Sequence, residues 1–369
     1  MIDSEELGAW IRLLETPGVG RESARRLLAA FGSPQAVLAA STTARREVVG
    51  AVASTALAET SAALDQQIRI TLDWLAAETA APRSVIPLDH PQFPPALLHA
   101  ADPPLMLYAQ GRLKLLGGEA LAVVGSRNPT RQGTDNARAF SAHLSQSGFT
   151  VVSGLALGID AAAHEGGLEG AASTVAVVGT GLDRVYPKRH LALARRIAEN
   201  GLIVSEYSLG TPPLPENFPN RNRIIAGLTR GTLVVEAALK SGSLITARLA
   251  SESGRDVFAI PGSIHSPQSR GCHALIKQGA KLVESAQDIL EELNLPGAAS
   301  PIKATQGALV LEEEDAVLHA LGFDPVTLDA LVARTHWSAA ALSVRLLELE
   351  LNGQIARLPG QLFQRIGPA

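Results

Sequence analysis

Short apolar runs rich in Val, Ile and Leu recur through the middle of the chain, and each is followed by a longer segment with the helical period. Strands that are apolar on both faces are typical of a parallel sheet covered by helices on both sides. The pattern therefore predicts an α/β domain with a parallel sheet. The predicted strands are residues 120–125, 150–154, 174–179, 202–206, 231–237, 256–262 and 280–285.

Residues 1–84 show short helical patterns interrupted by glycine and proline. The segment LLETPGVGRESARRLL (13–28) predicts a helix, a tight Pro-Gly-x-Gly turn and a second helix, because glycine adopts backbone conformations closed to other residues. It resembles a helix-hairpin-helix, whose helix start can hold a phosphate, and AFGSPQAVLAAS (30–41) is a candidate second copy. The net charge of −2 over residues 1–84 favours the alternative, a small helical packing module without nucleic-acid contact.

The end of the chain predicts a winged-helix-like module. DAVLHAL, VTLDALVAR and SAAALSVRLLELELNG have the pattern of three helices, and QIARLPGQLFQRI that of a two-stranded wing. A helix that reads duplex DNA presents basic or amide side chains to the groove. The third helix offers Arg345 but also Glu348 and Glu350. We therefore expect a protein-interaction or packing module, not a duplex reader.

These patterns divide the chain into domains. Residues 1–84 are the helical domain and residues 85–297 the sheet domain, whose Pro-rich start (85–115) is predicted to be a connecting strap. Residues 298–310 form an Ala/Ser/Gly/Pro linker, and residues 311–369 form the terminal module.

Composition excludes several classes of protein. With 46% hydrophobic and 18% charged residues, the 369-residue chain is not disordered. The single cysteine, Cys272, excludes a disulfide framework and a Cys-based zinc site. No apolar run is long enough to span a membrane, and the N-terminus does not resemble a secretory signal. We therefore expect a cytoplasmic protein without a membrane partner.

The net charge of −4 argues against a nucleic-acid partner only if the charge is evenly spread. It is not. Residues 85–297 have a net charge of +1, and residues 298–369 have −3. Within the middle domain, residues 217–248 carry a net charge of +4. The sequence thus contains a local basic footprint.

Small and polar residues follow the predicted strands at their carboxyl ends, where ligands bind in an open parallel sheet. The first strand runs into GSRNPTRQG (125–133), and the second ends in SGLALGIDAAAH (153–164). Each loop alone is a weak signal, but several such loops at one edge indicate a phosphate-recognising pocket. The candidates from these two loops are Gly125, Ser126, Arg127, Ser153 and Gly154.

Two further segments complete the predicted pocket. In FPNRNRIIAGLT (218–229), the guanidinium groups suit phosphate oxygens and the phenyl ring can stack a base. KSGSLITA (240–247) provides a predicted helix N-terminus, which favours an anion. The alternative is that an arginine at 221 or 223 forms a structural salt bridge with Glu206, Glu216 or Glu236. The candidates are Phe218, Arg221, Asn222, Arg223, Lys240, Ser241, Gly242, Ser243 and Thr246.

Catalytic residues are not indicated. Asp160 and His164 lie four residues apart, so they share one face of a helix, but no third group completes a nucleophile–base–orienter set. The nine histidines show no metal-ligand spacing. We interpret the Asp160–His164 pair as structural, and expect no enzyme activity, no cofactor and no metal.

Seven segments, taken together, resemble in order the motifs of the DprA/Smf family of DNA-processing proteins. They are GSR (125–127), SGLALGIDAAAH (153–164), GTGLDRVYP (179–187), FPNRNRIIAGL (218–228), SGSLITA (241–247), GRDVFAIPG (254–262) and LIKQGA (275–280). The resemblance implies an extended Rossmann-like domain, flanked by a small helical domain (helix-hairpin-helix or SAM-like) and a winged-helix-like domain. It further implies a protein that binds single-stranded DNA and loads the RecA recombinase onto it, protecting incoming DNA during natural transformation and homologous recombination.

The resemblance also implies site residues and a homodimer. Arg127, Phe218, Arg221 and Asn222 would line the DNA site, with Lys240, Ser241, Gly242, Ser243 and Thr246 on its far side. The family dimerises through the Rossmann-like domain, which maps near residues 264–281. The candidates there are Ile264, His273, Leu275 and Ile276, although burial in the core explains Leu275 and Ile276 equally well.

Two features depart from the family pattern, and two other functions stay open. His190 stands where members often have Asn, and TPPLPEN (211–217) has no Lys for a basic contact. A similar Rossmann-like core occurs in LOG-type nucleotide phosphoribohydrolases, but the P-G-G-x-G-T-x-x-E loop of those enzymes is absent. The third possibility is a structural adaptor that binds no ligand.

Overall fold

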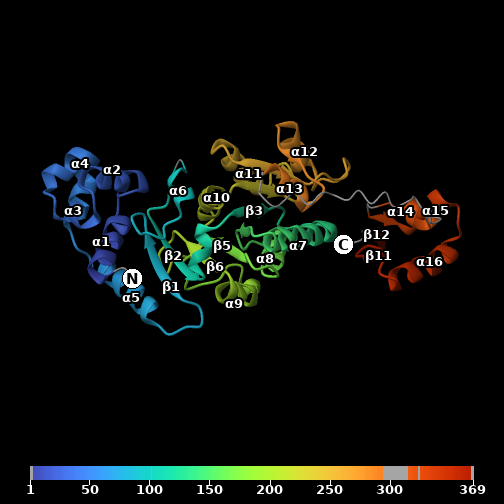
Figure 1. Cartoon of the computed structure of the whole chain (residues 1–369), viewed down its shortest axis with the longest axis horizontal. Helices are drawn as coiled ribbons and strands as arrows, with labels where there is room; N and C mark the ends of the chain where they lie inside the picture. The colour runs from blue at the N-terminus through green and yellow to red at the C-terminus, as the bar shows by residue number, and fades with distance from the viewer. Residues whose placement is uncertain (1–2, 101, 294–314, 323–324, 367–369) are drawn as a thin grey trace. The chain divides into compact units, whose positions relative to one another are not determined.

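The computed structural model describes residues 3–100, 102–293, 315–322 and 325–366 (Figure 1). The chain divides into two compact units, residues 1–294 and residues 295–369, and each is described by itself. In the described residues, no helix has both the length and the apolar character needed to cross a membrane.

The first unit begins with a helical module. The turn that the sequence predicts between its first two helices is present, and Gly18 adopts a φ of +82° there. Asp3, Ser33, Ser41 and Ser61 cap the first, third, fourth and fifth helices by accepting hydrogen bonds from backbone N–H groups. The helices are α1 (Ser4–Glu15), α2 (Arg21–Phe31), α3 (Pro34–Ala39), α4 (Thr42–Ala58, interrupted at Gly50) and α5 (Ala62–Ala76).

A nine-stranded sheet follows, with the order β1-β2-β6-β5-β4-β3-β7-β8-β9. The strands from β3 to β9 pair in parallel with their neighbours, which confirms the parallel sheet predicted from the apolar runs. These strands are β3 (Ala120–Val124), β4 (Thr150–Ser153), β5 (Thr174–Val178), β6 (Leu202–Ser205), β7 (Gly231–Val234), β8 (Asp256–Ala259) and β9 (Lys281–Leu282).

The remaining two strands correct the prediction for residues 85–115. β1 (Arg83–Pro87) pairs antiparallel with β2 (Met106–Gly111), and β2 pairs antiparallel with β6. The segment is therefore part of the sheet, and the prediction of a connecting strap is wrong there. Most of its prolines lie between the two strands, around the short helix α6 (Pro95–Leu98), where they remove no hydrogen bond from the sheet.

Helices cover both faces of the sheet, because neighbouring residues of one buried strand point to opposite sides. Val177 of β5 packs in the same cluster as Ile224 on one face, whereas Val178 packs with Leu193 and Ile197 on the other. The helices of the first face are α10 (Asn217–Leu228), α11 (Ser243–Glu252) and α12 (Arg270–Lys277). Those of the second are α8 (Ile159–Gly167) and α9 (Leu191–Asn200), with α7 (Arg131–Gln146) packed against α8. The short helix α13 (Ala286–Glu292) follows β9 and contacts α7.

The second unit is a small winged-helix module with its own core. Leu331, Leu342, Leu346 and Phe363 are among the buried residues of this core. A three-stranded antiparallel sheet has the order β10-β12-β11, so the predicted wing gains one short strand. The elements are α14 (Ala316–Leu321), β10 (Val326–Thr327), α15 (Leu328–Thr335), α16 (Ala339–Leu351), β11 (Ile355–Leu358) and β12 (Leu362–Arg365).

Candidate nucleic-acid interface

A cavity of about 500 Å³ opens where the loop after β3 meets α10 and the N-terminus of α11. Most of the predicted binding residues line it, although they come from segments far apart in the sequence. The predicted residues in its wall are Gly125, Ser126, Arg127, Phe218, Arg221, Asn222, Lys240, Ser241, Gly242, Ser243 and Thr246. Ser153, Gly154 and Arg223 do not line this cavity.

Two exposed cations, Arg127 and Lys240, line the cavity. Arg127 lies over the ring of Phe218, with its guanidinium carbon 5.9 Å from the ring centroid. Lys240 follows the loop after β7 and is exposed. Among the residues that the structure describes, neither cation has an ion-pair partner. Both charges are therefore available to an anion in the cavity.

An aromatic pair extends from the cavity wall. The ring of Phe218 lies 5.5 Å from that of Tyr186, centroid to centroid, with an interplanar angle of 38°. Tyr186 belongs to the loop between β5 and the short 3₁₀ helix η2 (Lys188–His190), and it is half exposed. Arg127 covers part of this pair, so a cation and two rings meet at one place.

The glycines near the cavity allow close packing of the backbone. A Cβ on Gly125 would lie 2.7 Å from the side chain of Ile159, and one on Gly158 would lie 2.4 Å from the carbonyl oxygen of Ser126. Gly158 also has a φ of +78°. The two loops after β3 and β4 can thus pack together only with glycine at these positions.

Arg221 is part of the cavity wall but is only 4% exposed. Its guanidinium donates to the carbonyl oxygen of Val177 and lies 4.0 Å from the carboxylate of Asp160. A Cβ on Gly154 would overlap this guanidinium, so Gly154 makes room for Arg221. Burial lowers the pKa of Arg221 to about 10, against the opposing effect of Asp160.

Asp160 and His164 hold the loop after β4 in place. The Asp160 carboxylate accepts hydrogen bonds from the N–H groups of Gly154 (3.1 Å) and Ala156 (3.2 Å). Burial raises the pKa of Asp160, although Arg221 opposes that effect. Nε2 of His164 accepts from the N–H of Leu155 (3.2 Å), and its Nδ1 lies 2.7 Å from the Thr174 hydroxyl.

These contacts agree with a structural role for the Asp160–His164 pair. Burial lowers the pKa of His164 to about 3, so the imidazole is neutral at physiological pH. Ser153, at the end of β4, is also buried, and its hydroxyl donates to the carbonyl oxygen of Val123 (2.7 Å).

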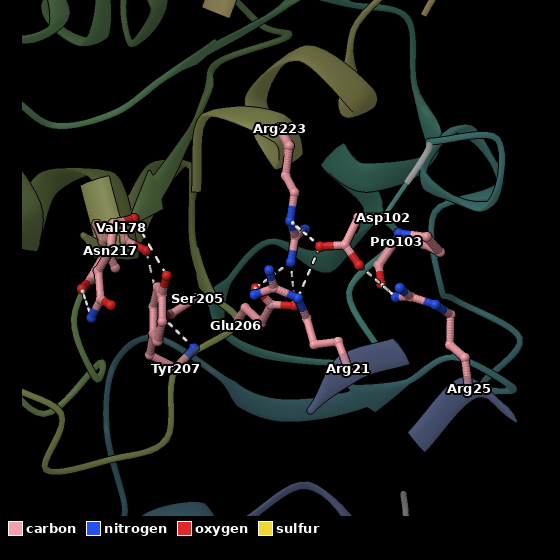
Figure 2. Close-up of polar contacts among 11 residues, drawn as sticks. Arg21, Arg25, Asp102, Pro103, Val178, Ser205, Glu206, Tyr207, Asn217 and Arg223 are labelled. Atoms are coloured by element: carbon pink, nitrogen blue, oxygen red, sulfur yellow. Dashed lines mark hydrogen bonds and ion pairs between the residues drawn. The ribbon is translucent and has the colours of Figure 1, made fainter. Parts of the chain in front are cut away.

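Arg223 lies in an ion-pair cluster that we call the arginine–carboxylate cluster: Arg21, Arg25, Asp102, Glu206 and Arg223 (Figure 2). Arg223 donates to Glu206 at 2.6 Å and lies 3.1 Å from Asp102. From the helical module, Arg21 contacts both carboxylates (2.9 and 3.3 Å), and Arg25 contacts Asp102 at 2.6 Å. This arrangement matches the alternative that Arg223 pairs with Glu206, and it joins the helical module to the sheet domain.

The cluster also changes the acidity of Asp102. Burial by itself would raise the pKa of this carboxyl, but the three surrounding guanidinium groups lower the pKa below its ordinary value. Of the other two carboxylates proposed as partners, Glu236 instead accepts hydrogen bonds from the backbone N–H (2.9 Å) and hydroxyl (2.5 Å) of Thr130. Glu216 forms no ion pair within the described residues.

A second basic segment, which the sequence-based predictions did not include, lies between β5 and the end of α9. Residues 184–196 contain five cations and no carboxylate. Arg184 pairs with Asp183 at 3.3 Å. Within the described ranges, no hydrogen bond or ion pair engages the other four side chains, which are Lys188, Arg189, Arg195 and Arg196. A count of charge along each loop would have found this segment, and Tyr186 lies within it.

The predicted dimer residues differ in burial, and among them only Leu275 lines an apolar groove. Ile264 is 73% exposed, whereas Leu275 and Ile276 are partly buried against the core of the sheet domain. His273 contacts the carbonyl oxygen of Gly262 through Nε2 (3.0 Å). Leu275 also lines a groove of about 460 Å³ between α11 and α12, together with Leu239.

No group of His, Cys, Asp and Glu that could hold a metal ion occurs in the part of the chain described.

Fold and site together define a Rossmann-like domain with a cavity lined by exposed cations, joined in one chain to a winged helix. Residues 84–294 match the family model for DNA recombination-mediator protein A, and residues 301–361 match that for the DprA winged helix domain. The chain therefore belongs to the DprA/Smf family of DNA recombination-mediator proteins.

Individual relatives agree with this assignment. The protein Smf of Escherichia coli is 42% identical over 302 residues, covering 80% of each chain. The DNA processing protein DprA of Streptococcus pneumoniae is 50% identical over 200 residues, which are 54% of this chain and 71% of that protein. The crystal structure of that protein has a TM-score of 0.68 and 37% identity, and covers 77% of this chain and 97% of its own.

A second solved structure concerns DNA processing protein A from Helicobacter pylori. It has a TM-score of 0.52 and 32% identity, and covers 57% of this chain and 95% of that chain. That structure is described as giving insights into the unique single-stranded DNA binding mode of that protein.

Proposed function

We propose that this protein binds single-stranded DNA in the cavity between β3, α10 and α11, and makes or breaks no covalent bond there. The observation that carries the proposal is that Arg127 and Lys240, which have no ion-pair partner among the described residues, line one cavity with Phe218, whose ring contacts both Arg127 and Tyr186. Cations bind phosphates and rings stack bases, which is how sequence-tolerant proteins hold single strands. The single-strand binding described for the Helicobacter pylori relative supports binding of a single strand by this chain as well.

The strand continues, in this proposal, from the cavity across Tyr186 to the second basic segment. Lys188 and Arg189 follow Tyr186 directly in the chain, and Arg195 lies on α9. Arg221 acts differently from the exposed cations. It is buried against Val177 and Asp160, and through Asp160 it helps to hold the loop after β4 in position. The arginine–carboxylate cluster fixes α10 to the helical module.

The test is a binding titration with single- and double-stranded oligonucleotides over a series of salt concentrations. We expect tighter binding of the single strand and a steep loss of affinity with salt, because counterions are released from the phosphates. Equal affinity for both forms, or no dependence on salt, contradicts the proposal. Incubation with AMP tests the phosphoribohydrolase alternative, for which released adenine is the positive result.

We further propose that the chain forms a homodimer through a surface that includes Ile264 and the groove between α11 and α12, and delivers the bound strand to the RecA recombinase. The exposed side chains of Leu239 and Ile264 support the dimer, and the family description as a recombination mediator supports the transfer to RecA. Ile264→Asp is expected to give a monomer in sedimentation experiments. A RecA filament should assemble faster on single-stranded DNA when the wild-type protein is present, and no acceleration contradicts this part.

A further inference from the structure

Helix α16 of the winged-helix module is apolar on two opposite faces. Leu342, Leu346 and Leu349 are buried in the core of the module. On the opposite side, Val344 is 62% exposed, Leu347 56% and Leu351 80%. A surface helix normally has one apolar face and one polar face, and a helix that is apolar all round is normally buried. The exposed apolar face of α16 therefore indicates a surface that binds a partner.

The exposed residues form one continuous stripe, which we call the α16 stripe: Trp337, Ala340, Val344, Leu347 and Leu351. Their spacing alternates between three and four residues, which is the spacing of a seam between two packed helices. Trp337, just before the helix, is 41% exposed. The stripe thus has the pattern of a surface that receives another helix.

Duplex DNA does not fit this surface. In a winged helix, the third helix is the element that enters the major groove. Here its exposed face carries no Lys or Arg, and Glu348 and Glu350 lie beside the stripe. The charge of Arg345 is already engaged, because its guanidinium contacts Asp315 (2.7 Å) and Glu348 (2.6 Å). Carboxylates at this position repel phosphates.

We propose that the α16 stripe docks an amphipathic helix of a partner protein, in which Lys or Arg residues flank the apolar side chains. Glu350 has no ion-pair partner in the described part of the module. It lies in the last turn of α16, where the helix dipole also places partial negative charge. The cations of the partner therefore meet the stripe at its Leu351 end.

Two other occupants fit less well. A helix of 13 residues is about 20 Å long, and one stripe along it is short for a permanent homodimer, whose interface buries more than about 1,000 Å² per partner. A second copy would also bring Glu348 and Glu350 of both chains to the same seam. The segment before the module, residues 298–314, has the wrong charge, because it contains one lysine and three consecutive glutamates.

The first test uses the full chain and two synthetic helical peptides. Both carry Leu at the seam positions, one flanked by Lys and the other by Glu. We expect at least tenfold tighter binding of the Lys peptide, and at least a tenfold loss with Leu347→Asp. Ile70→Asp, on an exposed apolar position of α5, is the matched control. Reversing charge with Glu348→Lys/Glu350→Lys should invert the preference. Equal binding of both peptides, or no effect of Leu347→Asp, overturns the proposal.

The second test identifies the occupant in cells. Benzoyl-phenylalanine in place of Val344 of the full chain is photo-activated, and the cross-linked segment is sequenced by mass spectrometry. We expect a segment of another protein with an apolar stripe at helical spacing and flanking Lys or Arg. A cross-link to a second copy, to residues 298–314, or to nucleic acid overturns the proposal, as does the absence of any cross-link. None of these outcomes depends on the DNA cavity, so the two proposals fail separately.

Discussion

The salt dependence of DNA binding gives a quantitative test of the cavity. Arg127 and Lys240 line it, and no ion pair engages either among the described residues. For single-stranded DNA, each phosphate that a protein neutralises contributes about 0.7 to the slope of log K against log salt concentration. The double variant Arg127→Ala/Lys240→Ala should therefore bind with a slope that is shallower by about 1.4.

The double variant should also bind single-stranded DNA more weakly, by an amount that follows from the same slope. If the electrostatic contribution vanishes near 1 M salt, each contact is worth about a factor of five at 0.1 M, and both together about 25. Fluorescence anisotropy with a labelled oligo-dT measures this directly between about 50 and 300 mM salt. Tenfold more weakening than this would mean that the variant has lost more than two phosphate contacts.

A matched control separates local contacts from net charge. Arg131→Ala/Arg138→Ala removes two exposed arginines from α7, neither of which lines the cavity. The net charge changes by the same amount, so we expect a slope close to that of the wild type. An equal fall in both double variants, or an unchanged slope in the cavity variant, refutes the assignment of the cavity.

Three further predictions concern the residues that hold the site in shape. Arg221→Ala should destabilise the first unit by about 3 kcal/mol in urea unfolding, because it leaves Asp160 as an unpaired buried carboxylate; a loss below about 1 kcal/mol contradicts the structural role. His164 stays neutral when folded down to about pH 3 but is protonated in the unfolded chain below about pH 6.5. As the pH decreases from about 6.5 to about 3, the free energy of unfolding should therefore decrease by about 1.4 kcal/mol per pH unit. His164→Asn should remove this contribution to the pH dependence. Asp102→Asn should cost about 1–2 kcal/mol at pH 7. Because the folded-state pKa of Asp102 is lowered, the difference from wild type should vanish as the pH falls below that value, and a constant difference down to pH 2 counts against the cluster.

The sheet was predictable wherever strands are buried on both faces. Val123, Val152 and Val177 lie in continuous apolar runs, and each run became a parallel strand. β1 and β2 were missed because their hydrogen-bonding partners are antiparallel and their sequence is surrounded by proline. Proline marks the ends of strands as well as loops, so composition alone does not distinguish the two.

Most residues that line the cavity could be predicted from the sequence, but the direction in which each side chain points could not. Phe218, Arg221, Asn222 and Ile225 of α10 line the cavity, and their spacing of three, four and seven residues places them on one helix face. Arg223 is two residues from Arg221 and lies on another side, where it meets the carboxylates of Asp102 and Glu206. In the sequence FPNRNR the two arginines look equivalent. Only the helix period and the partners separate them: Asp102 before β2, Glu206 after β6 and the helical module.

The net charge of a sequence segment also differs from the charge that the folded segment can offer to a ligand, because the fold determines which cations form ion pairs. In residues 217–248, ion pairs engage four of the five cations: Arg221 and Arg223 as above, Arg230 with Glu119, and Arg248 with Glu252 one turn along α11. Residues 184–196, which did not stand out in the sequence, leave most of their cations unpaired in the described structure. A single strand that leaves the cavity over Tyr186 therefore meets more available positive charge along α9 than along α10. The net charge of a segment measures its composition, whereas its attraction for phosphate depends on which carboxylates the fold brings beside it.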